Sequence, residues 1–128
     1  MAYYFNKIIN TSFEEAIAKV TDALKAQGFG VLTEIDVKST LKQKLDVDFR
    51  NYRILGTCNP PFAYKALSVE DKIGTMLPCN VIVQELSEGR IEIAAIDPIA
   101  SMSAVQNSAL GDIAYEVQDR LRKVIKSL

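Results

Sequence analysis

The C-terminal segment from Leu110 to Leu128 constrains the fold more than any other part of the sequence. Its apolar residues recur at intervals of three and four, which places them on one uninterrupted face of a helix. Its acidic residues come first and its basic residues last, the order that the helix dipole favours. A helix with one apolar face needs an apolar surface to pack against, and the rest of the chain must supply it.

A second helix of this kind is predicted near the N-terminus. Ser12 and Glu15 have the spacing of a capping box, in which each side chain satisfies a backbone amide at the start of a helix. Gly28 supplies the left-handed residue that ends it. The apolar positions between them share one face, and they are Phe13, Ala16, Ile17, Val20, Ala23 and Leu24.

The segments between and before these helices have the composition of β-strands. They are rich in β-branched and aromatic residues or alternate between apolar and polar positions. Ser87-Glu88-Gly89 is turn-like, so the last two segments form a hairpin. The predicted strands are Tyr3–Ile9, Phe29–Ile35, Tyr52–Cys58, Leu77–Leu86 and Arg90–Ile96.

Shorter helices interrupt this pattern. Val37–Leu45 has a narrow apolar stripe, and Asn59-Pro60-Pro61 is a favourable helix start because Asn caps and Pro is tolerated in the first turn. The residues from Pro98 to Asn107, with Met102 among them, have no clear periodicity, and such a segment can shape a pocket beside Asp97.

These elements predict an α+β fold in the order β-α-β-β-β-β-α. An antiparallel sheet of about five strands has one buried face, and the two long helices cover it. A chain of 128 residues supports one hydrophobic core, so residues 1–128 are expected to form a single domain.

Charge and composition exclude several classes of partner. The 15 basic and 16 acidic residues leave a net charge of -1, which gives no field to attract nucleic acid. No apolar run reaches the length of a membrane span, and the first residues lack the pattern of a signal peptide. We therefore expect a cytoplasmic protein without nucleic-acid or membrane partners.

The chain contains no histidine, which limits its chemistry to carboxylates, amines, phenols and thiols. Ser-His-Asp triads, Cys-His pairs and histidine-based zinc sites are excluded. The two cysteines are expected to be reduced thiols, because a cytosolic domain of this size has no need of a disulfide.

The predicted topology brings three of these chemical groups together. Cys58 ends the third strand, Cys79 opens the fourth and Asp97 follows the fifth, so all three are expected at the same end of an antiparallel sheet. Cys58 also precedes a helix start, where the positive end of the helix dipole favours a thiolate. Asn59 and Lys65 complete the candidate pocket, and Lys65 can serve an anionic ligand.

Several interpretations of this cluster remain open. Cys58 and Cys79 can form a thiol redox pair, or they can bind a metal ion together with Asp97. The metal site is the weaker hypothesis, because the spacing matches no zinc pattern and a fourth ligand is missing. The plainest interpretation is that both cysteines are small buried hydrophobic residues.

Four segments resemble a known family. They are Gly28-Phe29, Ile54-Leu55-Gly56-Thr57-Cys58-Asn59-Pro60, Leu77-Pro78-Cys79-Asn80-Val81 and Asp97-Pro98. With them the chain resembles, over essentially its whole length, the prokaryotic family called domain of unknown function 302. The resemblance implies a fold similar to that of TATA-binding protein and a homodimer, but it assigns no role to the cysteines, and a shared fold does not imply DNA binding.

The sequence therefore supports two hypotheses. The first is a non-enzymatic homodimeric binding or scaffold domain with a pocket near Cys58, Cys79 and Asp97. The alternative is a thiol-dependent redox or metal-handling protein, with Cys58 as the reactive group and Cys79 as the resolving partner. A homodimer is expected in the first case because an edge or the uncovered face of the sheet would otherwise stay open to solvent.

Overall fold

The computed structural model describes residues 2–128 and contains one sheet of five strands. The chain order is β1 (Tyr4–Asn10), α1 (Phe13–Ala26), β2 (Gly30–Asp36), α2 (Val37–Leu45), β3 (Tyr52–Cys58), α3 (Pro60–Val69), the 3-10 helix η1 (Asp71–Met76), β4 (Cys79–Ser87), β5 (Arg90–Ile96), α4 (Pro98–Ser101), the 3-10 turn η2 (Ser108–Leu110) and α5 (Gly111–Lys126). The predicted α+β class is confirmed.

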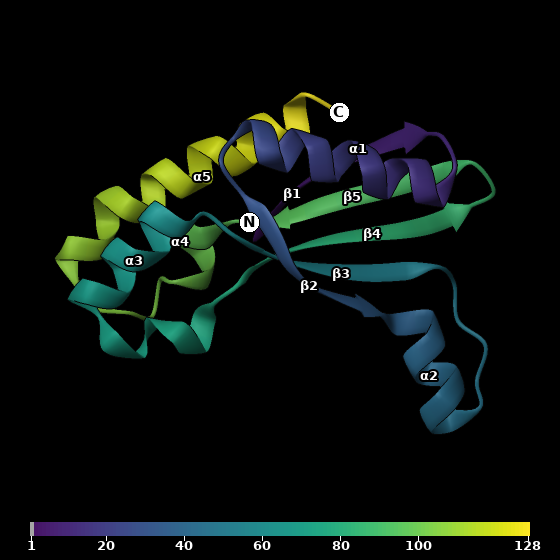
Figure 1. Ribbon diagram of the computed structural model, residues 1–128, viewed down its shortest axis with the longest axis horizontal. Coiled ribbons are helices and arrows are strands. Elements are labelled where there is room, and N and C mark those ends of the chain that lie inside the picture. The colour runs from purple at the N-terminus through teal and green to yellow at the C-terminus, as the bar shows by residue number, and fades with distance from the viewer. Residues whose placement is uncertain (1) are drawn as a thin grey trace.

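The strands pair in the order β1-β5-β4-β3-β2, and every pair is antiparallel. Strands β2 to β5 form a meander, while β1 joins the far side of β5, so α1 crosses from one edge of the sheet to the other. Helices α1 and α5 lie side by side over the same face (Figure 1). This is the one-sided covering that the two amphipathic helices predict.

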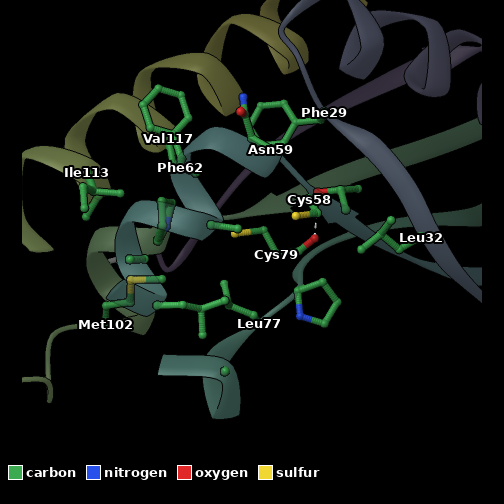
Figure 2. Close-up of a pocket in the computed structure, with 18 of the residues that line it drawn as sticks. Phe29, Leu32, Cys58, Asn59, Phe62, Leu77, Cys79, Met102, Ile113 and Val117 are labelled. Carbon is green, nitrogen blue, oxygen red and sulfur yellow. Dashed lines mark hydrogen bonds between the residues drawn. The ribbon is translucent and has the colours of Figure 1, made fainter. Parts of the chain in front are cut away.

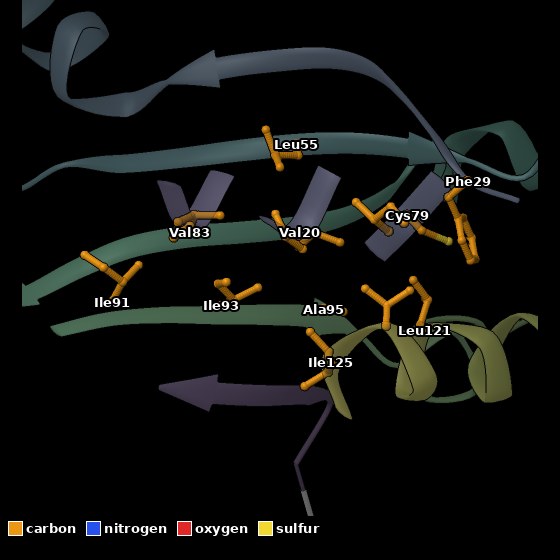
Figure 3. Close-up of a cluster of buried hydrophobic side chains, with 14 of the residues drawn as sticks. Val20, Phe29, Leu55, Cys79, Val83, Ile91, Ile93, Ala95, Leu121 and Ile125 are labelled. Carbon is orange, nitrogen blue, oxygen red and sulfur yellow. The ribbon is translucent and has the colours of Figure 1, made fainter. Parts of the chain in front are cut away.

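The main core lies between that face of the sheet and the two helices. Alternate residues of β4 and β5 point into it, including Val81, Val83, Ile91 and Ile93, which are fully buried. Val20 of α1 and Leu121 of α5 belong to the same cluster and pack on this face of the sheet (Figure 3). Burial of this kind contributes roughly 1.5–3 kcal/mol for each large aliphatic side chain.

The ends of α1 show why the helix begins and stops where it does. The Ser12 hydroxyl accepts a hydrogen bond from the amide of Glu15, as predicted. The Glu15 carboxylate accepts from the Thr11 hydroxyl at 2.7 Å, so it does not complete the expected capping box. Gly28 has a φ of 86°, and the Phe29 amide returns to the carbonyl of Leu24, which closes the helix with a left-handed residue.

Some boundaries differ from the sequence predictions. The fourth strand begins at Cys79 and not at Leu77, because Leu77 caps the end of η1, a 3-10 helix that the sequence did not predict. The segment predicted as irregular, 98–107, contains the single helical turn of α4. Within residues 2–128, no helix combines the length and the apolar character needed to cross a bilayer.

Candidate functional site

A cavity of about 390 Å³ opens at the end of the sheet where β3 finishes and β4 begins. Helices α3, η1, α4 and α5 supply part of its wall (Figure 2). Of the described residues that line it, none is charged. The apolar side chains labelled around it in the figure are Phe29, Leu32, Phe62, Leu77, Met102, Ile113 and Val117.

The cavity lies between two separate hydrophobic clusters. Phe29, Cys79 and Val117 belong to the main core under α1 and α5. Ala66 and Leu110 belong to a smaller cluster formed by α3, η1 and the start of α5. All five residues line the cavity. The two clusters therefore meet across an apolar gap rather than packing into one continuous core.

The register of β3 and β4 brings the two cysteines to this cavity. Thr57 pairs directly with Cys79, and its hydroxyl donates to the Cys79 carbonyl at 2.8 Å. Cys58 follows Thr57, so both thiols line the cavity from adjacent strands, as Figure 2 shows. The predicted neighbourhood of the end of the third strand and the start of the fourth is confirmed.

The two thiols have different surroundings. Cys79 is buried. Its burial, and to a smaller extent the neighbouring Cys58, raises the pKa of its thiol from 9.0 to about 11. Cys79 is therefore a protonated, weakly nucleophilic thiol at neutral pH. Cys58 is half-buried and directly precedes Asn59 and α3. Both cysteines are free thiols.

Asn59 is buried and links three elements at the back of the site. Its side-chain amide donates to the carbonyl of Gln27 at 3.2 Å, and so does the guanidinium of Arg120 from α5. Asn59 was predicted to cap α3, but its side chain makes no capping hydrogen bond. It ties the end of α1 to the start of α3 instead, and thereby fixes the wall beside Cys58.

Comparison with known proteins identifies the family and agrees with the overall fold. The family model described as domain of unknown function DUF302 matches residues 5–128. The chain belongs to the DUF302 family. A crystal structure of an uncharacterized conserved DUF302 protein from Bacillus stearothermophilus is similar, with 28% sequence identity, a TM-score of 0.89 and 98% of each chain covered. No curated protein matches the chain.

In this DUF302 chain, three of the five predicted pocket residues line the cavity: Cys58, Asn59 and Cys79. Lys65 and Asp97 are not among the lining residues. Lys65 is exposed on α3, and its amine lies 5.8 Å from the centre of the Phe62 ring.

The Asp97 carboxylate is occupied by structural hydrogen bonds. It accepts from the Ile99 amide and from the Gln118 side chain, both at 3.0 Å, so it caps α4 and joins it to α5. Across residues 2–128, no three cysteine, aspartate or glutamate side chains are grouped so that they could hold a metal ion. The predicted ligand set of Cys58, Cys79 and Asp97 is therefore not assembled.

The sequence missed most of the apolar wall. Met102 lies in the segment expected to shape a pocket, and it does line the cavity. Gly74 comes from η1 and Leu77 follows it directly, and this 3-10 helix has no periodic signature. Leu32 reaches the cavity because β2 bulges between Val31 and Thr33, a distortion that alternation alone does not reveal.

Proposed function

We propose that this chain is a binding domain that takes a small, uncharged and largely apolar molecule in the cavity beside Cys58 and Cys79. The observation that supports the proposal is a cavity of about 390 Å³ with no charged lining residue among those the structure describes. Small-molecule pockets of proteins are commonly about 300–1,000 Å³ and mostly apolar. An apolar gap of this size between two core clusters forfeits packing contacts unless a guest supplies them.

The polar groups of the wall are consistent with such a guest. The Thr57 hydroxyl and the Asn59 amide are both engaged in hydrogen bonds within the protein. They therefore place little demand on a ligand for hydrogen bonds. The half-buried thiol of Cys58 is a weak donor at the wall, suited to a single weak polar contact.

Binding can be tested with 1-octanol as the probe. Titration of the isotope-labelled protein should shift the amide resonances of α3 and of the residues next to Cys58 and Cys79 in a saturable manner. Ala63→Phe places a ring into the cavity from α3 and should weaken binding at least about tenfold. Ala18→Phe is the matched control, because Ala18 is exposed on α1 and does not line the cavity.

Unfolding experiments supply a second measurement. A ligand that binds only the folded state raises the melting temperature as its concentration increases. Octanol should therefore stabilise the wild type and Ala18→Phe, and not Ala63→Phe. Equal stabilisation of Ala63→Phe, or no saturable shift in the wild type, would contradict the proposal.

We further propose that the domain is cytoplasmic and functions as a homodimer, since an edge and one face of its sheet are otherwise open to solvent. Large apolar side chains exposed on β1 and β2, among them Ile8 and Ile35, support this association. Sedimentation of the purified protein should give about twice the 14.2 kDa of one chain. A species of 14.2 kDa alone would refute the homodimer.

A further inference from the structure

A second hollow, of about 340 Å³, lies on the face of the sheet opposite to α1 and α5. The strand register explains why it forms. Ala94 of β5 pairs with Asn6 of β1 on one side and with Ile82 of β4 on the other. Its methyl group is the smallest side chain among these neighbours, so the sheet is depressed at this point between taller residues.

Tyrosine rings stand at both sides of this depression. Tyr4 of β1 pairs with Ile96, next along the same face from Ala94, and Tyr52 of β3 pairs with Gln84 of β4. Both tyrosines line the hollow, together with Tyr3. The faces of aromatic rings carry negative charge density and attract cations.

The Glu92 carboxylate is fixed at one end of the hollow. It accepts hydrogen bonds from the Asn6 amide at 2.9 Å and from the Gln84 amide at 2.7 Å. Both donors are neutral, so they orient the carboxylate without cancelling its charge. Among the ion pairs in the part of the chain that the structure describes, none involves Glu92.

Arg50 contacts Gln84, the residue that donates to Glu92. Arg50 donates to the Gln84 side-chain oxygen at 2.8 Å, and its guanidinium lies 4.4 Å from the centre of the Phe49 ring and 5.6 Å from that of Tyr52. Arg50 is not a lining residue of the hollow. The site thus presents one oriented negative charge and three tyrosine rings, and no positive group among its described lining residues.

From this arrangement we propose that the hollow binds an organic ammonium ion, with the cationic nitrogen beside Glu92 and its alkyl groups against Tyr4 and Tyr52. A carboxylate and aromatic faces together are the groups that recognise alkylated ammonium ions. A divalent metal ion is a poor match, because one carboxylate provides too few hard oxygen ligands. An anion is repelled by Glu92. The proposal is independent of the apolar cavity, which lies at another place on the sheet.

Choline and its uncharged analogue 3,3-dimethyl-1-butanol form a matched pair of probes, since they differ mainly in the positive charge. Titrations followed by amide and tyrosine resonances should show choline binding at the hollow at least about tenfold more tightly than the alcohol. Glu92→Gln keeps the shape of the side chain and removes the charge, so it should abolish this preference. Glu88→Gln, in the exposed β4–β5 turn, should leave it unchanged.

Tyr52→Leu tests the aromatic contribution separately and should weaken choline binding about threefold to tenfold while leaving alcohol binding nearly unchanged. Circular dichroism of each variant identifies any that fails to fold. Equal affinity of the wild type for the two probes would overturn the proposal. So would a choline preference that survives Glu92→Gln, or a change from dimer to monomer on Glu92→Gln, which would make the hollow an interface between two copies.

Discussion

The buried thiol of Cys79 should make the domain less stable at alkaline pH. Burial, and after it the neighbouring Cys58, raises the pKa of Cys79 from 9.0 to about 11 in the folded protein. In the unfolded chain the thiol has an ordinary pKa and loses its proton first as the pH rises. The unfolded state then binds fewer protons than the folded state, so the free energy of unfolding falls with increasing pH.

The size of this effect follows from the two pKa values. Below the unfolded pKa the thiol is protonated in both states, and its contribution to stability is fully present. With pKa values of 9.0 unfolded and about 11 folded, linkage removes about 1 kcal/mol from the free energy of unfolding between about pH 8 and about pH 10. The loss continues until the folded thiol also titrates, and reaches about 3 kcal/mol in total.

Urea unfolding under a phosphine reductant measures this directly. Wild type and Cys79→Ala are compared at each pH, because lysine and tyrosine titrate in both proteins and cancel in the difference. The difference in stability should shrink by about 1 kcal/mol between about pH 8 and about pH 10. In the Cys58→Ala background most of the decline should remain, because burial is the larger cause. A difference that stays constant with pH would refute the reasoning.

Three further predictions concern the same end of the fold and its edge strand. Gly56→Ala should lower the free energy of unfolding in urea by about 1–3 kcal/mol, because its Cβ would lie 2.1 Å from the Thr33 hydroxyl and 2.8 Å from the Pro78 ring. Adding Thr33→Ala should restore part of the lost stability. Strictly additive effects of the two substitutions would contradict the steric cause. Arg53→Met should lower the free energy of unfolding by about 1 kcal/mol in low salt and by less in about 1 M NaCl, because the guanidinium pairs with carboxylates of α1 and β2 at 3.0 Å and 2.9 Å. A loss of stability that salt does not change would exclude an ionic origin. Iodoacetamide at neutral pH, followed by mass spectrometry, should modify Cys79 about a hundredfold more slowly in the folded than in the unfolded protein, and comparable rates would show that the thiol is not protected.

Much of the architecture could be predicted because its signals are local. The narrow apolar stripe of Val37–Leu45 predicted α2 with the boundaries that the structure shows. The turn at Ser87-Glu88-Gly89 predicted the β4–β5 hairpin. The meander of antiparallel strands also predicted that Cys58 and Cys79 lie close together, because the end of one strand lies beside the start of the next. In the structure both cysteines line one cavity.

The site was predicted less completely because side-chain direction depends on tertiary packing. Lys65 was placed in the pocket from its position in the chain, but α3 turns Ala66 inward and leaves Lys65 exposed. Asp97 follows the fifth strand as predicted, but its capping of α4 was not predicted, because one turn of helix is too short to show periodicity. The cavity itself arises from two clusters that fail to merge, which no single segment encodes.

The placement of β1 has a consequence for how the protein is made. Tyr4 pairs with Ile96, and no other strand of the sheet pairs with β1 within the described chain. During synthesis β1 leaves the ribosome before β5, so its backbone amides and carbonyls bond to water until β5 has emerged. Contacts between such distant residues slow folding and lengthen the exposure of nascent strands. Closure of the sheet at the β1–β5 pair therefore cannot begin until the chain has been synthesised as far as β5.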